Sequence, residues 1–500
     1  MAVTKSPDAE APPLARTVTT AAAVTLVVLA VSRLVFHLFA GPLPDEAYYW
    51  LWGQHPALSY FDHPPLQAWM QAASNAVFGD SLFALRIPSL ITTAWIAGVL
   101  ACWARRAHAV MPEFSAWFVT AIFFASPMLF IYTMIVFNDH LMVALLLTSA
   151  ALFVMVFERA GRDAAVAPLP LYGAALALGL ATLTKHNAAL FGLGVAAAIM
   201  FTPRLRILLR SPHLYLAALL SIACLTPVMV WNLGHDGASF QYNLVDRINV
   251  AQPLGRRLEQ FFTLTALALL TLSPFLVGPI VGALRSRWND PFLSHWRALA
   301  LGTTLVPLAI LLVLSQFTAV LFYWTIVAWV AAVPLAAIAL RRRWVAIAHF
   351  TLGATVAVAY TVNYAIFPLS ALFGPADHES AIVYGWDKTT LRIVTARQQS
   401  EADFLLATDY RVGAILAFSS GDRDVEVISN RKSQFDLWFD ENRRAGQDAL
   451  IVSDERFPMS GLVTQRFASI EEAGMISVSR FGVHIRDYTL HVGRGYIPRN

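Results

Sequence analysis

Two adjacent acids near the N-terminus are candidates for proton-transfer chemistry. Asp45 and Glu46 follow a Gly-Pro-Leu-Pro stretch and come directly before a run of aromatic residues. A partly desolvated carboxylate can act as a general base that accepts a proton from an attacking hydroxyl or amine. An acid at this position can also cap a helix and interact favourably with its dipole. Capping explains one acid better than two, so Asp45 and Glu46 both remain candidate catalytic residues.

Residues 60–65, Tyr-Phe-Asp-His-Pro-Pro, form the most specific motif of the chain. The paired prolines exclude helix at His63 and Pro64 and favour an extended backbone. A stiff turn therefore presents Asp62 and His63 together. Three interpretations stay open: a solvated turn, a divalent metal ion held by Asp62 and His63, and a protonated His63 facing a phosphate.

Two further ionisable residues, Asp139 and Lys185, lie at the ends of apolar runs. Ionisable groups at membrane depth are costly and are functional candidates by default. The alternative is an interfacial side chain that reaches water. Lys185 has polar neighbours in an otherwise apolar hairpin, and its ammonium could pair with a phosphate.

Arg256 and Arg257 form a basic pair in a later long loop, before the apolar run at 260, on the side of the membrane where basic residues are generally rare. A phosphate would account for this pair, and so would a salt bridge to Glu259 or to the C-terminal region. Tyr323 lies at the end of another apolar run, where an aromatic belt at the membrane interface is the simpler interpretation.

The composition indicates a membrane protein with a soluble C-terminal region. Of the 500 residues, 57% are hydrophobic and only 14% are charged, whereas soluble proteins carry about 25% charged residues. More than half of the 32 acidic residues lie between Asp377 and Asn500. The net charge of +4 does not indicate a nucleic-acid partner, because the basic residues cluster in short loops between apolar runs. Cys102 and Cys224 lie within apolar runs and are expected to be buried free thiols.

The apolar runs predict an α-helical polytopic fold with about 11 spans and at most 13. The expected spans cover approximately residues 17–39, 88–104, 114–136, 141–158, 169–184, 188–202, 213–232, 260–284, 298–316, 322–340 and 345–366. The first run lacks a small-residue cleavage site and is expected to remain as a signal anchor. Arginine-rich loops alternate with acidic ones, which places the loop 40–87 and the C-terminal region on the outer side, the periplasm of a Gram-negative cell.

The chain is expected to form two domains, residues 1–369 in the membrane and residues 370–500 in the periplasm. Within the first domain, the loop 40–87 carries two amphipathic stretches that predict helices on the membrane surface. In the second, alternating patterns predict strands near 404–408, 425–428 and 449–452, two more between 476 and 492, and a helix over 410–418. These elements predict a small soluble α/β domain with a parallel core.

The motifs occur in an order that resembles the GT-C membrane glycosyltransferases, which take a sugar from a polyprenyl phosphate. Among these, the chain looks like the superfamily of protein O-mannosyltransferases and lipid A aminoarabinose transferases. Its Tyr-Phe-Asp-His-Pro-Pro motif looks closest to the branch of the rhizobial galacturonic acid transferases. The resemblance covers about residues 20–370 and rests on Asp45-Glu46-Ala47-Tyr48, residues 60–66, Arg86-Ile87-Pro88-Ser89, Asn138-Asp139, Thr184-Lys185 and Tyr323-Trp324.

The resemblance implies roles for these residues. Asp45 matches the acid that activates the acceptor, with Glu46 and Asp139 beside it as catalytic candidates. Asp62 falls where the aminoarabinose transferases carry a metal-binding Glu, and His63 replaces a Lys that faces phosphate. Lys185 matches a lysine near the donor phosphate. Arg256 or Arg257 would supply the second basic residue, and Tyr323 would complete the phosphate site.

The expected function is therefore sugar transfer, with inversion, from a polyprenyl-phosphate donor to lipopolysaccharide, lipid A or another cell-envelope glycan. The enzyme is expected to be a monomer in the inner membrane, surrounded by membrane lipids, with a divalent metal ion as the one candidate cofactor. The alternative is a transporter or flippase of lipid-linked sugars, which would place ionisable residues near the middle of spans.

Overall fold

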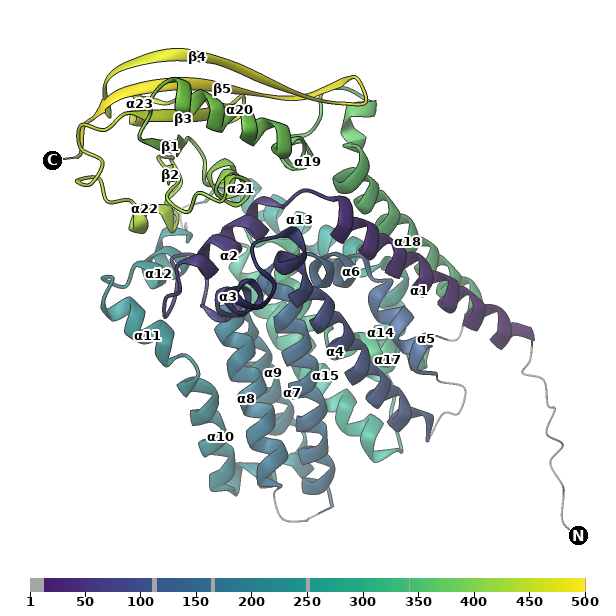
Figure 1. Cartoon of the computed structure of the whole chain (residues 1–500). Helices are drawn as coiled ribbons and strands as arrows, with labels where there is room; N and C mark the ends of the chain where they lie inside the picture. The colour runs from purple at the N-terminus through teal and green to yellow at the C-terminus, as the bar shows by residue number, and fades with distance from the viewer. Residues whose placement is uncertain (1–12, 110–114, 163–166, 249–251, 341, 500) are drawn as a thin grey trace, which may run out of the picture.

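A computed structural model describes residues 13–109, 115–162, 167–248, 252–340 and 342–499 (Figure 1). Helices fill the lower part of the molecule, and a five-stranded sheet with its own helices covers one end of them. This arrangement confirms the predicted fold class, a polytopic helical body with a small C-terminal α/β domain.

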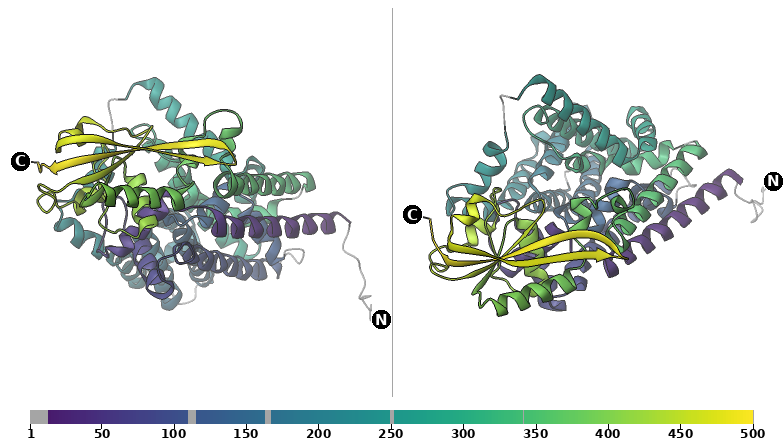
Figure 2. Two further views of the ribbon diagram at one scale, coloured as in Figure 1. Left: turned by 45° about the horizontal axis from the view of Figure 1, so that its top comes forward. Right: turned by 90° about the horizontal axis from the view of Figure 1, so that it is seen from above.

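The helical body contains five helices that are long and apolar enough to cross a membrane by length and composition: α1 (Pro13–Phe39), α4 (Leu82–His108), α7 (Asn138–Ala160), α15 (Pro291–Leu314) and α18 (Arg343–Thr361). A shorter apolar helix, α8 (Pro168–Thr184), packs against α7. Helices α1 and α18 run side by side away from the C-terminal domain (Figures 1 and 2).

Five other apolar segments form bent pairs of helices rather than straight helices. The pairs are α5 (Ala116–Phe124) with α6 (Pro127–Met134), α9 (Ala189–Phe201) with the 3-10 segment Pro203–Arg210, α10 (Pro212–Ala223) with α11 (Thr226–Leu233), α13 (Leu254–Leu272) with α14 (Pro274–Arg285), and α16 (Ile326–Trp329) with α17 (Ala332–Ala339). They bend by 87°, 109°, 45°, 89° and 67° in that order. Up to ten spans result if each pair crosses once, so the predicted number of about eleven stays a prediction.

Prolines explain why these spans bend. A proline stands at or soon after each break, namely Pro127, Pro203, Pro227, Pro274 and Pro334. Proline has no N–H to donate to the preceding turn, and its ring clashes with the carbonyl four residues earlier. The spans predicted over residues 114–136, 213–232, 260–284 and 322–340 are therefore bent, although their apolar residues are helical.

The loop 40–87 contains the two predicted helices, α2 (Pro44–Gln54) and α3 (Leu66–Phe78). Helix α2 does not lie on an open surface, because most of its residues are buried between the helical body and the C-terminal domain. Figure 1 shows it at the junction of the two parts. Its aromatic side chains therefore pack inside the protein, where the sequence predicted contact with the membrane surface.

The C-terminal sheet has the strand order β2-β1-β3-β5-β4. Its strands are β1 (Phe404–Ala407), β2 (Glu426–Val427), β3 (Ala449–Asp454), β4 (Phe467–Arg480) and β5 (Val483–Tyr496). β1 pairs in parallel with β2 and β3, whereas β5 is antiparallel to β3 and β4. The parallel core and the final hairpin confirm the predicted α/β pattern.

Short helices complete the structure and join its two parts. They are α12 (Ala238–Gln241), α19 (His378–Ala381), α20 (Trp386–Gln399), α21 (Tyr410–Ser420), α22 (Phe435–Trp438) and α23 (Gly461–Thr464). α21 packs directly on α2, where Trp50 contacts Phe418 and Tyr48 contacts Tyr410 at ring-centroid distances of 5.1 and 5.3 Å. Aromatic pairs of this kind favour a fixed docking geometry, so the C-terminal domain covers one end of the helical body.

Candidate active site

A polar cavity of 320 Å³ lies where α2, the ends of several body helices and the C-terminal domain meet. Six predicted site residues line it: Asp45, Asp62, His63, Asp139, Lys185 and Tyr323. The remaining lining residues are Tyr48, Tyr49, Phe137, Asn138, Tyr242, Arg247, Leu321, Trp324, Tyr410 and Arg431. The fold thus brings together residues that are spread over most of the chain.

Asp45 is placed in the first turn of α2 by the proline that begins this helix. Its carboxylate is half-buried and accepts a hydrogen bond of 3.4 Å from the hydroxyl of Tyr410. The pKa of Asp45 is raised to about 6, because burial and the nearby Asp62 raise it by more than Arg431 and Tyr410 lower it. A carboxylate with this pKa is a stronger base than an ordinary aspartate and is still mostly ionised near neutral pH.

Glu46 has a different environment, although it is the next residue. It is fully buried, and its carboxylate contacts Arg86 at 2.8 Å. One carboxylate oxygen also accepts from the N–H of Leu43 at 3.1 Å, and the other accepts from the N–H of Val136 at 3.0 Å. Arg86 in turn donates to the carbonyls of Ala40 and other residues at the end of α1. This arrangement favours a structural role for Glu46, joining α1 to α2, over the predicted catalytic role.

We expect the variant Glu46→Gln to unfold at a clearly lower temperature than wild type. Removing one partner of a buried ion pair typically costs about 3–5 kcal/mol, because the other charge remains buried without compensation. The measurement is thermal unfolding of the purified protein in detergent. Glu379→Gln is the matched control, because Glu379 pairs with Arg411 at the similar distance of 2.9 Å but is 59% exposed. Equal midpoints for the two variants would contradict the structural role.

Asp62 is held by residues from both domains. Its Oδ1 atom accepts from Arg431 at 2.7 Å, and its Oδ2 atom accepts from the hydroxyl of Tyr48 at 2.9 Å. The hydroxyl of Tyr48 itself accepts from the N–H of Gln434 at 2.6 Å. The adjacent N–H of Phe61 donates to the side chain of Gln434 at 2.8 Å. The turn at residues 60–65 is therefore locked to the C-terminal domain.

A metal site built on Asp62 and His63 does not fit this arrangement. Both carboxylate oxygens of Asp62 already accept from protein donors, and the guanidinium of Arg431 neutralises this carboxylate at 2.7 Å, so a metal cation would have to compete with an arginine for it. Burial and the charges of Lys185 and Arg247 lower the pKa of His63 well below its usual value. A neutral imidazole can donate one N–H to a phosphate, but it cannot supply the positive charge that the sequence interpretation required.

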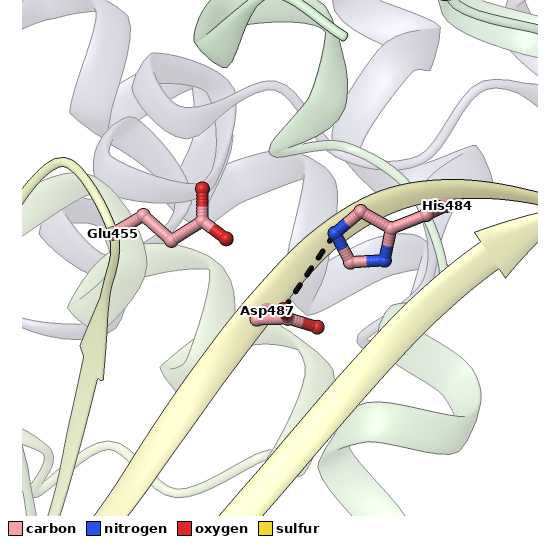
Figure 3. Close-up of side chains that lie close together, drawn as sticks. All are labelled: Glu455, His484 and Asp487. Carbon is pink, nitrogen blue, oxygen red and sulfur yellow. Dashed lines mark ion pairs between the residues drawn. The ribbon is translucent and has the colours of Figure 1, made fainter. Parts of the chain in front are cut away.

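Within the described residues, the group with metal-ligand spacing lies elsewhere, on the C-terminal domain. It consists of Glu455, His484 and Asp487, whose ligand atoms lie within 4.8 Å of one another (Figure 3). His484 and Asp487 already contact each other at 3.6 Å, and Asp487 also accepts from Ser477. The first two residues are exposed, as solvated surface groups usually are, and none of the three lines the central cavity.

Lys185 and Asp139 form a buried ion pair at the cavity wall. The ammonium contacts the two carboxylate oxygens at 2.9 and 2.8 Å, and it lies 4.6 Å from the ring centre of Tyr323. Lys185 occupies the break between α8 and the following 3-10 turn, so its side chain reaches the cavity instead of the membrane. The three predicted residues thus form one unit in which Asp139 and Tyr323 orient the cation.

Arg256 and Arg257 do not line the central cavity. Arg257 donates to the carbonyl of Gln252 at 2.9 Å and lies over Phe317, whereas Arg256 lines a separate cavity of 450 Å³. The basic residue that reaches both cavities is Arg247. Its guanidinium lies 4.9 Å from the ring centre of Trp324 and forms no ion pair with any residue that the structure describes. Arg247 therefore takes the place predicted for Arg256 or Arg257.

The cavity residues that sequence reasoning missed include Arg247, Tyr410 and Arg431. Arg431 lies 4.2 Å from the ring centre of Tyr410 and pairs with Asp62, which is 369 residues away in the chain. No local pattern distinguishes this arginine from others in the C-terminal region. The one available signal was the turn after β2 at residues 429–432, which contains small and basic residues. Only the docking of the C-terminal domain shows that Arg431 faces the cavity.

Two further cavities adjoin the central one on different sides. A cavity of 430 Å³ shares His63, Lys185, Arg247 and Trp324 with it and is otherwise mainly apolar, with Leu190, Leu225, Ile310 and Leu314 in its walls. Another, of 370 Å³, shares Asp45, Phe137 and Tyr410 with it and is rich in aromatic residues. Lys185 and Arg247 therefore lie toward the first side cavity, and Asp45 lies toward the second.

Comparison with known proteins supports a transferase. Residues 62–231 match the family described as dolichyl-phosphate-mannose-protein mannosyltransferase. The lipid A galacturonosyltransferase RgtD of Rhizobium johnstonii is 26% identical over 408 residues, which cover 79% of this chain and 76% of RgtD. The family match includes Asp62 and His63 of the motif and the segments that carry Asp139 and Lys185.

The fold is shared with ArnT from Cupriavidus metallidurans. The apo structure aligns with a TM-score of 0.59 at 15% identity and covers 94% of this chain and 98% of ArnT. The structure of ArnT bound to undecaprenyl phosphate gives 0.61 at 17% identity and covers 95% and 97%. Together, the family match, the relative and the common fold confirm the resemblance of this chain to the GT-C membrane glycosyltransferases and to the branch that includes RgtD.

Proposed function

We propose that the protein transfers a sugar from a polyprenyl-phosphate donor to lipid A or a related envelope glycolipid at the periplasmic face of the inner membrane. The observation that carries this proposal is that a base and phosphate-binding cations line one polar cavity at the mouth of an apolar groove. The alternation of basic and acidic loops supports the periplasmic orientation.

The donor fits the side that holds the cations. Its polyprenyl chain would lie in the apolar 430 Å³ cavity, and its phosphate would meet Lys185 and Arg247 where this cavity joins the central one. Arg247 has no carboxylate partner among the described residues, so its charge is available to an incoming anion. The ion pair with Asp139 holds Lys185 in position without removing its hydrogen-bonding capacity.

The acceptor fits the side that holds Asp45. The 370 Å³ cavity is lined by Tyr132, Phe322, Tyr360 and Tyr364, and it opens onto Asp45 opposite the cations. Glu379 and Arg411 of the C-terminal domain lie at the same cavity. Such an aromatic and partly charged wall suits a glycolipid, which presents both apolar and polar surface.

The geometry supports a single displacement with inversion. Asp45 accepts the proton of an acceptor hydroxyl, and the oxygen attacks the anomeric carbon from the face opposite the phosphate. The bond between this carbon and the phosphate oxygen breaks, and polyprenyl phosphate departs as an anion. Lys185 and Arg247 stabilise the charge that develops on the leaving group, which is the largest catalytic contribution expected in such a site.

The relatives supply the proposed sugar and acceptor. RgtD is named a galacturonosyltransferase of lipid A, which supports an acidic sugar as the donor group. Three cations, Lys185, Arg247 and Arg431, line the cavity, and a sugar carboxylate would be attracted to them as a phosphate is. The sugar proposed here is therefore a hexuronic acid.

Reconstituted protein tests the function. Purified enzyme in liposomes would receive radiolabelled undecaprenyl-phosphate-linked galacturonic acid, a neutral hexose or an amino sugar, with lipid A as the acceptor. We expect label to appear in lipid A from the uronic acid donor. Label transferred only from another donor would overturn the proposed sugar, and no transfer from any of the three donors would overturn the proposed function.

The pH profile should depend on Arg431, because this arginine lowers the pKa of Asp45. A general base works only when ionised, so activity in wild type should fall as the pH drops through about 6. In Arg431→Gln the pKa of Asp45 should rise, and the acid side of the kcat/KM profile should move to higher pH. Arg423→Gln is the control, because Arg423 is 52% exposed and contacts Asp80 outside the cavity. If the acid side of the pH profile does not shift in Arg431→Gln, Arg431 does not control the pKa of Asp45.

A further inference from the structure

A cavity of 830 Å³ lies away from the active site and shares no lining residue with the central cavity. It is formed where the end of α7, the break after α9 and the start of α15 meet. Its charged or hydrogen-bonding lining includes Arg162, Arg204, Arg297, His295 and Trp288. The active site uses none of these residues.

Helix α7 fixes the distance between this cavity and the active site. Asp139 in the first turn of α7 lines the central cavity, and Glu158 in its last turn lines the large one. The rise of an α-helix is about 1.5 Å per residue, so these two residues lie roughly 28 Å apart along the axis. The hydrocarbon core of a membrane is about 30 Å thick. The two cavities therefore lie at opposite faces of the membrane, the large one at the face with the arginine-rich loops.

The lining divides into a basic rim and an apolar interior. Arg162 and Arg204 are exposed and form no ion pair with any residue that the structure describes. The acid in the wall, Glu158, is already neutralised, because Arg106 donates to both of its oxygens at 2.8 and 2.9 Å. The apolar part is formed by Ala197, Phe201, Leu301, Leu305 and Val306. This wall can hold hydrocarbon below a negatively charged group at the rim.

The positions of the remaining polar side chains also fit a ligand that has a negatively charged group above a hydrocarbon chain. Arg297 donates its Nε–H to the carbonyl of Leu284 at 2.7 Å, which fixes the side chain at the cavity wall. Trp288 donates to the carbonyl of Ala283 at 3.2 Å and lies at the interface level that tryptophan favours. A general preference for basic loops on the cytoplasmic side explains positive charge at this face, but it does not explain why the arginines surround an apolar cavity.

We propose that this cavity is a binding site for an anionic phospholipid, with the phosphate at Arg162 and Arg204 and an acyl chain against the apolar wall. Basic pockets between membrane helices on the cytoplasmic side recognise acidic headgroups in this way. The ligand class is a phosphodiester lipid such as phosphatidylglycerol, and its binding is independent of the transfer reaction.

Native mass spectrometry of the full-length protein tests the site, with phosphatidylglycerol or phosphatidylcholine as the added lipid. We expect the double variant Arg162→Gln/Arg204→Gln to bind phosphatidylglycerol roughly tenfold or more weakly, since each basic residue near the surface contributes about 1 kcal/mol. The matched control is Arg159→Gln/Arg210→Gln, which removes two exposed arginines from the same two segments but outside the cavity lining. The control should bind phosphatidylglycerol as wild type does.

Each other outcome overturns the proposal. An equal loss in both double variants would show diffuse surface attraction, and unchanged binding in the Arg162/Arg204 variant would exclude the cavity. Displacement of the lipid by millimolar inorganic phosphate would show that the rim recognises free phosphate instead of a lipid. Both variants replace exposed side chains, and their unfolding temperatures would be measured in parallel to confirm that they fold.

Discussion

The variant Asp45→Asn is expected to lose about 100-fold to 10,000-fold of the transfer rate, the range that a positioned general base contributes. Asparagine keeps the size of the side chain but cannot accept the proton of the acceptor hydroxyl. The carboxylate of Asp45 accepts a hydrogen bond from the hydroxyl of Tyr410, and the amide oxygen of asparagine can still accept it. The fold should therefore survive, and donor binding should stay close to that of wild type.

The measurement is single-turnover transfer of labelled sugar in liposomes, together with titration of the donor. Asp80→Asn is the matched control in the same loop, because Asp80 is 47% exposed and lies outside the central cavity. Transfer that persists undiminished in Asp45→Asn would remove Asp45 as the base. An equal loss of transfer rate in Asp80→Asn would show that transfer is sensitive to any change in this loop and does not depend specifically on the carboxylate of Asp45.

The variant Arg247→Gln is expected to bind the donor about 10-fold to 100-fold more weakly, because a hydrogen bond to a charged group contributes about 1.5–3 kcal/mol. Its guanidinium lies at the junction of the polar cavity and the apolar groove, where the donor phosphate is proposed to lie. Titration with undecaprenyl phosphate alone measures this effect without any dependence on the sugar.

Arg256→Gln is the control that separates the structural assignment from the sequence interpretation. Arg256 lines the neighbouring 450 Å³ cavity but not the central one, so its variant should bind undecaprenyl phosphate nearly as wild type does. A large loss in Arg256→Gln with none in Arg247→Gln would reverse the assignment and restore the basic pair predicted from the sequence.

Lys185→Ala is expected to weaken donor binding too, but the interpretation of this variant is more difficult. Removing Lys185 leaves Asp139 buried beside the cavity without its partner, which costs about 3–5 kcal/mol in typical buried pairs. Loss of binding would then combine lost contact with a disturbed wall. Arg247 has no such partner among the described residues, so its variant reports on the ligand more directly.

The C-terminal domain is part of the active site in this arrangement. Arg431 and Tyr410 line the central cavity, and Gln434 accepts from the backbone at Phe61. The domain therefore holds the 60–65 turn in place and adjusts the electrostatics of Asp45, which the pH experiment on Arg431 measures.

Local sequence predicted much of this protein, because short-range constraints determine the features concerned. Runs of apolar residues predicted the helical body, and alternation predicted the strands β1, β2 and β3. The acidic pair identified the segment around Asp45, and the stiff paired prolines identified the segment around Asp62. Lys185 was identified because a charged residue interrupts an apolar hairpin, which is costly unless it has a function. The breaks in the five bent segments also had a local signal, the prolines. The apolar pattern alone did not reveal these breaks.

Only the tertiary structure decided which of these residues act together. Asp45 and Glu46 are neighbours in sequence, but successive residues of a helix point in directions about 100° apart, so one faces the cavity and the other faces Arg86. Arg247 follows the π-helical segment Tyr242–Asp246 and lines the cavity, whereas Arg256 and Arg257 do not. Arg431 reaches Asp62 only because the sheet domain docks on α2. Contacts between residues hundreds of positions apart depend on how whole elements pack, and no local pattern records that packing.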